Sequence, residues 1–472
     1  MIVGRNEEIA LLKSLTEDDR SHFVAVYGRI RVGKTFLIRE AYDYKFTFQH
    51  AGLSEGGLKD QIFAFTSSLK DLGVTFEKNP GAWLEAFEGL KEVVRKSQEK
   101  KKVVFLDELS WMDTPKSDLI RAIEFFWNSF ASARNDVILI VCASATSWML
   151  NKVVHNKGGL YNRLTEQIRL EGFLLKECEE YVKSNGLLFT REQILSFYMI
   201  FGGIPFYWSF LRKGESIVQN IDRVIFKKNA PLRNEFDYLY ASIFKNPEEY
   251  IKIIRALGTK KIGMTREEII KNTGIANSGD LTIKLDELEN CGFIRKYTAF
   301  GKKTKNSIYQ LIDNYTLFYF KFLVDYPTDE HFWTNQVGTP KVNNWQGLAF
   351  ERVCLEHVNQ IKVKLGISGV YTEINSWSCK KDEEKGIFGS QIDLLIVRAD
   401  RVINLCEIKY SGTTYTIKAI EDENIRNRIS DLRNVTKTRC AIFPTIITTY
   451  GLVSNGYSNN IQSVVTLDDL FV

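Results

Sequence analysis

The sequence has no apolar run near the roughly 18 residues that a membrane-spanning helix needs, and its first residues lack the basic-then-apolar layout of a signal peptide. Its 7 cysteines are scattered without a Cys-x-x-Cys pair, and its 5 histidines form no His-Glu-x-x-His motif. These absences argue against a disulfide framework and against a zinc site. We therefore expect a cytoplasmic protein that does not bind membranes and whose cysteines are small core residues.

Low-complexity tracts and obvious repeats are also missing. A composition of 44% hydrophobic and 26% charged residues is typical of an ordinary globular protein. At 472 residues the chain is too long for one core, and a prior of roughly 100–200 residues per domain predicts about three domains. The net charge of +5 permits nucleic-acid binding without requiring it.

A phosphate-binding pattern lies in the N-terminal third. The short apolar strand 22–27 is followed by G-x-x-x-x-G-K-T and then by a helical segment, which is the context that gives this motif its meaning. Backbone N–H groups of such a loop cradle phosphates, Lys34 reaches the outer phosphates of ATP, and the Thr35 hydroxyl ligates Mg²⁺. The residues predicted to bind the nucleotide here are Gly28, Arg29, Ile30, Arg31, Val32, Gly33, Lys34, Thr35 and Phe36.

Two adjacent acids end a second apolar strand, 101–107. Strand alternation points Asp107 and Glu108 in different directions, so Asp107 can serve the Mg²⁺ shell while Glu108 polarises the attacking water. A third apolar strand, 137–143, ends at Ser144, whose hydroxyl we expect near the γ-phosphate as a sensor. Alternating strands and amphipathic segments predict an α/β multidomain protein whose first domain has a parallel sheet with helices on both faces.

These motifs resemble those of the AAA+ P-loop ATPases, and specifically of the prokaryotic AAA-type ATPases that carry a C-terminal nuclease-like domain. The resemblance implies that Gly4 and Arg5 pack near the adenine and that a helical lid follows the core. It makes Arg163 a candidate for sensing or completing the nucleotide site, which would require a homo-oligomer; a solvated arginine at a helix end is the alternative. Gly202-Gly203 could enter the nucleotide site or form only a structural turn.

The middle of the chain has the pattern of a winged helix. A capping box at Thr265 starts one helix, and the helix 281–291 has an apolar face that fits a recognition helix. Strands near 293–299 and 307–312 would pair across a loop containing lysines 302, 303 and 305, which could contact nucleic-acid phosphates. Because the recognition helix is acidic, docking to a protein or a scaffold role is an equal alternative to DNA contact.

The C-terminal stretch 391–409 has the pattern of a hairpin of two apolar strands. If the turn lies at 399–401, Val397 faces Ile403, Leu395 faces Leu405 and Asp393 faces Glu407. Two opposed carboxylates repel each other, so a shared Mg²⁺ or Mn²⁺ would offset the cost, with Lys409 beside them. Upstream, Glu351 lies within the apolar stripe of a helix and needs a partner. A salt-bridged structural hairpin is the alternative.

A helix with an inward Glu, a strand with Asp and a strand with Glu-x-Lys are similar to the PD-(D/E)xK nuclease fold. This resemblance implies catalytic roles for Glu351, Asp393, Glu407 and Lys409, with Asp393 and Glu407 as metal ligands. Ile392 stands where that fold usually has proline.

We therefore expect a P-loop ATPase fused to a metal-dependent nuclease that acts on nucleic acid, with DNA as the first candidate, and whose cleavage is gated or positioned by ATP. The alternative is an ATP-dependent switch whose inactive nuclease fold binds DNA or a protein partner. The expected domains are an AAA+ core (1–173), a helical lid (174–246), a winged helix (247–315) and a restriction-endonuclease-like α/β domain (330–472).

Overall fold

The computed structural model describes residues 2–244, 246–301 and 307–472. These residues form two compact units. One comprises Met1–Gly172 with Ile283–Cys291, and the other comprises Phe173–Thr282 with Gly292–Val472. Lysines 302, 303 and 305 of the expected wing lie outside the described residues. Within the described ranges, no helix is long and apolar enough to cross a membrane.

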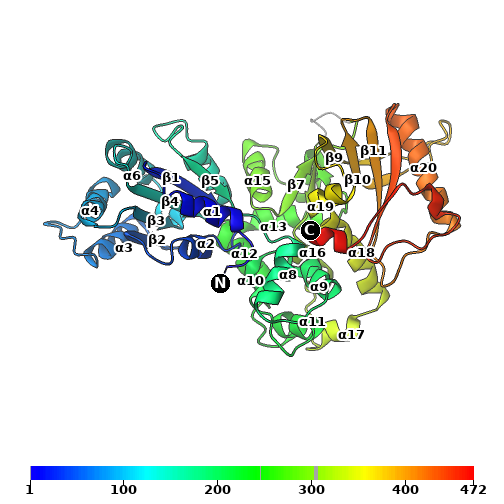
Figure 1. Cartoon of the computed structure of the whole chain (residues 1–472), viewed down its shortest axis with the longest axis horizontal. Helices are drawn as coiled ribbons and strands as arrows, with labels where there is room; N and C mark the ends of the chain where they lie inside the picture. The colour runs from blue at the N-terminus through cyan, green and yellow to red at the C-terminus, as the bar shows by residue number, and fades with distance from the viewer. Residues whose placement is uncertain (1, 245, 302–306) are drawn as a thin grey trace. The chain divides into compact units, whose positions relative to one another are not determined.

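The first unit is built on a five-stranded sheet of order β2-β3-β4-β1-β5 in which all neighbours are parallel. The expected parallel-sheet core is therefore confirmed (Figure 1). The strands are β1 (His22–Tyr27), β2 (Phe48–Ala51), β3 (Lys102–Asp107), β4 (Val137–Ala143) and β5 (Glu166–Arg169). The helices are α1 (Asn6–Ser14), α2 (Lys34–Ala41), α3 (Leu58–Lys70), α4 (Trp83–Lys96), α5 (Leu109–Met112), α6 (Leu119–Phe126) and α7 (Thr146–Met149).

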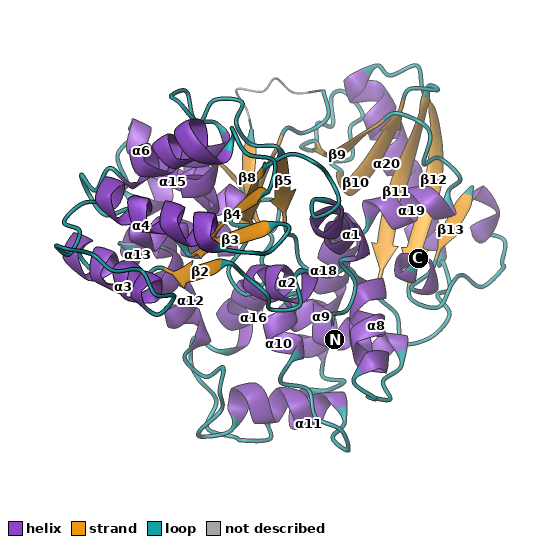
Figure 2. Ribbon diagram, turned by 60° about the vertical axis from the view of Figure 1, so that its left-hand side comes forward, coloured by secondary structure: helices purple, strands orange, loops and turns teal. Residues whose placement is uncertain are grey.

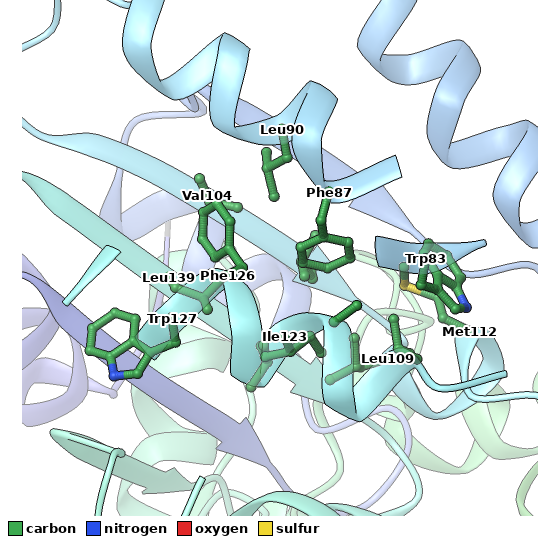
Figure 3. Packing of buried hydrophobic residues seen from close by; sticks show 14 of the residues in the cluster. Trp83, Phe87, Leu90, Val104, Leu109, Met112, Ile123, Phe126, Trp127 and Leu139 are labelled. Carbon is green, nitrogen blue, oxygen red and sulfur yellow. The ribbon is translucent and has the colours of Figure 1, made fainter. Parts of the chain in front are cut away.

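An aromatic-rich core fixes this sheet. Phe87 and Leu90 of α4 and Phe126 of α6 pack with Val104 and Leu139 of the central strands (Figure 3). All five side chains are fully buried. Each such side chain contributes about 1.5–3 kcal/mol of transfer free energy, so this face holds β3 and β4 rigidly beside each other. The carboxyl ends of these strands carry Asp107 and Ser144.

The second unit begins with a helical segment and continues into the winged-helix pattern. Its helices up to that point are α8 (Leu175–Ser184), α9 (Arg191–Phe201), α10 (Pro205–Trp208), α11 (Ile217–Ile221) and α12 (Glu235–Ile243). Gly202 ends α9 with φ 60, and a Cβ on Gly203 would lie 1.7 Å from the Phe173 carbonyl oxygen. Gly202-Gly203 therefore forms a turn in which two backbones approach closely.

The winged-helix pattern is present in the described residues. It comprises α13 (Pro247–Gly258), α14 (Arg266–Thr273), α15 (Gly279–Asn290) and a sheet of order β6-β8-β7. The strands β7 (Ile294–Tyr297) and β8 (Ile308–Leu311) pair antiparallel, as predicted, and β6 is Met264–Thr265. The second half of α15 groups with the first unit, where Asn290 Nδ2 donates to Ser147 Oγ at 3.1 Å.

The C-terminal sheet has the order β13-β12-β11-β10-β9, with strands β9 (Thr372–Ser378), β10 (Gln391–Arg398), β11 (Val402–Lys409), β12 (Ala441–Thr448) and β13 (Ser463–Val465) (Figure 2). The antiparallel hairpin of β10 and β11 is confirmed, with Val397 opposite Ile403 and Leu395 opposite Leu405. The remaining helices are α16 (Asn314–Phe322), α17 (Phe332–Gln336), α18 (Pro340–Glu356), α19 (Val358–Lys364) and α20 (Ala419–Thr436).

A β-bulge interrupts β10 where it pairs with β9. The register shifts between Ile392 and Leu395, which lie an odd number of residues apart and would face opposite sides of a regular strand. Both are nevertheless buried in one cluster with Leu405 and with Leu432 of α20. The extra residue of the bulge therefore turns Asp393 away from the α20 side.

A buried histidine joins α8 to α18. His357 is fully buried, its Nε2 accepts from the Leu175 N–H at 3.0 Å, and its Nδ1 donates to the Val353 carbonyl at 2.8 Å. Burial lowers the pKa of His357 to about 4. The unfolded chain therefore binds a proton at this residue at a higher pH than the folded chain does.

Because of this linkage, we expect the free energy of unfolding to decrease as the pH is lowered from about 6.5 to about 4. Between pH 7 and pH 5, His357 alone should account for a decrease of about 2 kcal/mol. His357→Gln removes the linkage, so the stability difference between wild type and variant should shrink at pH 5. Calorimetric melts at both pH values would measure this. His331→Gln, at an exposed position of the same unit, is the matched control. A His357→Gln difference that does not depend on pH would contradict the assignment.

Candidate functional site

The loop Gly28–Thr35 joins β1 to α2 and is shaped by its glycines. Gly28 has φ 148, and a Cβ there would lie 2.2 Å from the Leu170 carbonyl oxygen, while Gly33 caps α2 with φ 90. Both positions therefore favour glycine. Lys34 is buried, and its Nζ donates to the carbonyls of Gly28 at 2.9 Å and Arg29 at 3.0 Å. The ammonium thus lies inside the curve of the loop.

The two predicted Mg²⁺ ligands meet across the sheet. Thr35 Oγ1 donates to Asp107 Oδ2 at 2.7 Å, which places a hydroxyl of α2 against a carboxylate at the end of β3. The other oxygen, Asp107 Oδ1, accepts from the Glu108 N–H at 2.9 Å. Oxygen donors of these kinds are those that Mg²⁺ prefers, so the residues present fit a magnesium ion beside the phosphate loop.

Glu108 lies next to this pair in a left-handed backbone conformation, with φ 47. Ser144 at the end of β4 holds its carboxylate, because Ser144 Oγ donates to Oε1 at 2.6 Å and the Ser144 N–H donates to Oε2 at 3.2 Å. Burial raises the pKa of Glu108. The structure therefore gives Ser144 a role that the sequence did not indicate: it orients the candidate base.

The other predicted nucleotide-site residues do not all lie at the loop. Arg163 precedes β5, which runs parallel to β1, so Arg163 lies at the edge of the sheet where β1 begins and not at the edge where the loop follows it. Arg5, which is 8% exposed, precedes α1 in a left-handed conformation beside Gly4, and its guanidinium donates to the Glu171 carbonyl. Val32 is buried, whereas Phe36 is 43% exposed. Arg163 is exposed in the turn before β5. The structure thus leaves the roles of Arg5 and Arg163 as predictions.

In the C-terminal domain, two of the four predicted nuclease residues converge. Lys261 Nζ lies 2.6 Å from Glu351 Oε2 of α18 and 3.1 Å from Asp393 Oδ2 of β10. Gln391 Nε2 also donates to Asp393 Oδ1 at 2.8 Å. Burial raises the pKa of Glu351, and the nearby carboxylate of Asp393 adds to this effect. The partner that Glu351 needs is therefore an ammonium group.

Glu407 and Lys409 lie elsewhere, on the α20 side of the sheet. Glu407 forms ion pairs with Arg428 of α20 and with Lys409, whose Nζ is 2.8 Å from Oε1. Tyr410, the next residue of the chain, packs instead on Phe350 of α18, as strand alternation requires. The predicted sharing of one metal ion by Asp393 and Glu407 is therefore wrong for this geometry, because the bulge turns Asp393 toward α18.

Across residues 2–244, 246–301 and 307–472, no group of three or more His, Cys, Asp or Glu side chains could hold a metal ion. The sequence reasoning missed Lys261 and Arg428, which form ion pairs with these acids. Neither lies near its partner in the chain, so only a correct tertiary arrangement could have identified them.

Residues 2–209 match the model of a family described as an ATPase domain predominantly from Archaea. The uncharacterized protein MJECL04 of Methanocaldococcus jannaschii is 23% identical over 446 residues, covering 93% of this chain and 92% of that protein. The Walker-type ATPase paby2304 of Pyrococcus abyssi is 16% identical with a TM-score of 0.48, covering 67% of this chain and 95% of that chain. The ORC2 protein of Aeropyrum pernix, solved as ADPNP–ADP complexes, is 11% identical with a TM-score of 0.41, covering 76% and 96%.

The family match covers the phosphate loop and both acidic positions, and it ends before the winged helix and the C-terminal sheet. The loop Gly28–Thr35, the Thr35 hydroxyl and the carboxylates of Asp107 and Glu108 are the groups that ATP hydrolysis needs, and the family match points to the same activity. Residues 2–209 of this chain therefore contain a P-loop ATPase domain.

Proposed function

We propose that this protein hydrolyses ATP and that its C-terminal domain binds a DNA or protein partner without cutting it. The 2.7 Å contact of Thr35 with Asp107, next to a glutamate held by Ser144, is the observation that carries the first half of this proposal. ATP turnover by the purified chain, measured as phosphate release, tests it.

The residues divide the work of hydrolysis among three tasks. Lys34 and the loop N–H groups bind and orient the phosphates, neutralising their charge where it grows in the transition state. Glu108 orients the attacking water and accepts its proton, and its raised pKa suits it to that task. Thr35 and Asp107 would hold Mg²⁺, which neutralises phosphate charge when bound.

Ser144 acts through Glu108 as a positioning residue. Ser144→Ala removes the 2.6 Å hydrogen bond that fixes the Glu108 carboxylate, so we expect kcat to fall about tenfold while KM for ATP changes little. Steady-state kinetics would show this split. Ser129→Ala, at an exposed serine of the same unit, is the matched control and should leave both constants unchanged. If KM rises and kcat is unchanged, Ser144 contacts the nucleotide directly.

The second half of the proposal rests on the positions of the four predicted nuclease residues, which lie in two pairs on opposite sides of the C-terminal sheet. Glu351 and Asp393 share one ion-pair partner, Lys261, and Glu407 pairs with Lys409 and Arg428. A metal-dependent nuclease needs carboxylates that converge on the ion with a lysine beside them. Because Glu351 and Asp393 do converge, metal-dependent cleavage is the rival function. A metal ion could bind between these two carboxylates only if Lys261 moved away from them.

Asp393→Asn separates the two functions. The variant strips Lys261 of one of its two carboxylate partners, so we expect it to melt below wild type in EDTA, and we expect Mn²⁺ not to raise the wild-type Tm. Glu383→Gln, at an exposed position of the same domain, is the control. A wild type that Mn²⁺ stabilises, with Mn²⁺-dependent cleavage of DNA that Asp393→Asn abolishes, would establish the nuclease instead.

A further inference from the structure

Gly52 is a buried residue that follows β2 and lies against the first turn of α5, the helix that begins directly after Glu108. Its N–H donates to the Asp107 carbonyl at 3.0 Å and so continues the pairing of β2 with β3. A Cβ at Gly52 would lie 2.8 Å from the Glu108 carbonyl oxygen and 2.9 Å from Met112 Cγ, which is closer than real Cβ atoms approach other groups. The backbone of Gly52 does not have a positive φ, so only lack of space opposes a larger residue here.

The end of β2 is held in place by Gln61 of α3, whose side chain is fully buried. The Leu53 N–H donates to Gln61 Oε1 at 3.0 Å, and Gln61 Nε2 donates back to the Leu53 carbonyl at 2.7 Å and to the Gly56 carbonyl at 3.2 Å. Moving this turn would leave buried donors and acceptors without partners, which is costly. Gly52, the residue before Leu53, therefore has little freedom to move away from α5.

The helix α5 is fixed on its own side. Leu109 and Met112 are fully buried and belong to the same core cluster as Trp83 (Figure 3). At the end of the helix, Trp148 Nε1 of α7 donates to Asp113 Oδ2 at 3.0 Å. A shift of α5 away from β2 would disturb this packing and this hydrogen bond. A side chain at Gly52 would therefore press on a helix that cannot easily give way.

Glu108 is the residue between these two fixed parts. Its backbone is left-handed, with φ 47 and ψ 46, and its carbonyl accepts from the Trp111 N–H at 2.9 Å. A residue with a Cβ keeps this conformation only where its surroundings hold it. The same conformation directs the Glu108 carboxylate to the Oγ and N–H of Ser144. The space left by Gly52 is thus one of the conditions that fix where this carboxylate lies.

We propose that Gly52 is a positioning residue for ATP hydrolysis. Because it has no side chain, the Glu108 carbonyl can lie against it, and Glu108 keeps the left-handed conformation that places its carboxylate beside Ser144. This role rests on the proposed function, in which Glu108 accepts the proton of the attacking water. Gly52 acts through the backbone of Glu108, whereas Ser144 acts through its side chain.

Gly52→Ala in the full chain tests this role. We expect kcat to fall about tenfold, because a small displacement of a catalytic group costs much of its effect, while KM and Kd for ATP stay within about twofold of wild type. Steady-state kinetics, ATP binding and a thermal melt would be measured on one preparation. Gly81→Ala is the matched control, since Gly81 is exposed in the same unit and the nearest atom to its added Cβ would be Glu85 Oε2 at 4.0 Å. It should keep the wild-type constants.

The same substitution in a Glu108→Gln chain separates positioning of Glu108 from a general structural effect. Without the carboxylate there is no proton acceptor left to position, so adding Gly52→Ala should leave the residual single-turnover rate within about twofold. An equal loss of rate in both backgrounds would show that the effect does not pass through Glu108, and would overturn the proposal.

The remaining outcomes distinguish this proposal from the proposed function. A wild type that hydrolyses ATP together with a Gly52→Ala chain of unchanged kcat would overturn the role of Gly52 alone. A wild type that does not hydrolyse ATP would overturn the proposed function and this role with it. A Gly52→Ala chain that melts far below wild type and no longer binds ATP would make Gly52 a glycine of purely structural importance, which also contradicts the proposal.

Discussion

Glu108→Gln is expected to lower the turnover number for ATP at least about 100-fold while the Kd for ATP stays within about threefold of wild type. Glutamine is isosteric with glutamate, so Ser144 Oγ can still donate to the side-chain carbonyl oxygen. An amide cannot accept a proton from water. The loss therefore falls on the chemical step, and the variant should retain bound ATP.

Single-turnover hydrolysis and equilibrium binding of ATP would be measured on the same preparation. Glu99→Gln is the matched control, since Glu99 is exposed in the same unit, and it should behave as wild type. Wild-type turnover in Glu108→Gln would assign the proton acceptor to another residue. A variant that no longer binds ATP would show that Glu108 has a binding role.

Lys34→Ala is expected to abolish measurable hydrolysis and to weaken ATP binding by about 10- to 100-fold. The buried ammonium donates to two loop carbonyls, and in the complex it would donate to phosphate oxygens instead. Hydrogen bonds to charged groups contribute about 1.5–3 kcal/mol, which sets the size of the binding loss. The loss of turnover is larger because negative charge on the phosphates is redistributed in the transition state.

The control for this variant is Lys45→Ala, which removes the same group from an exposed position of the same unit. Circular dichroism and a thermal melt would verify that Lys34→Ala is folded. A folded Lys34→Ala chain that hydrolyses ATP at the wild-type rate would mean that the phosphate loop is not the site of the reaction.

The geometry of the candidate nucleotide site was largely predictable because its parts are local. The strand, the loop and the helix that make up the phosphate loop are contiguous, and the glycines mark the positions where the backbone needs positive φ. Asp107 and Glu108 follow directly from the end of a buried strand. The contact of Ser144 with Glu108 was not predictable, since it depends on two neighbouring strands and on the left-handed backbone at Glu108.

The strands and the register of the C-terminal hairpin were predictable, but the predicted side of the sheet was wrong for Asp393. Val397 and Leu395 face their predicted partners, yet the bulge after Ile392 turns Asp393 to the other side of the sheet. A shift of one residue reverses the face of a side chain. Nothing in the alternation of β10 marks the bulge, because it arises from the pairing with β9.

Contacts between residues that are far apart in the sequence could not be predicted either. Lys261 lies in a turn before β6 and pairs with acids of α18 and β10, and His357 closes the end of α18 onto the start of α8. Such contacts depend on how helices pack, which periodicity alone does not determine. The position of Glu351 within an apolar stripe correctly predicted that its carboxylate has a partner, but it did not show that the partner is Lys261.

The central claim is that the loop Gly28–Thr35, with Asp107 and Glu108, forms a Mg²⁺-dependent ATPase site. The most direct measurement is hydrolysis of γ-labelled ATP by a stoichiometric amount of the full chain, with Mg²⁺ and with EDTA. We predict conversion of bound ATP to ADP and phosphate by wild type in Mg²⁺, and none in EDTA or by Glu108→Gln in Mg²⁺. Wild type that binds ATP with Mg²⁺ and leaves it intact, or that hydrolyses it equally in EDTA, would contradict the account.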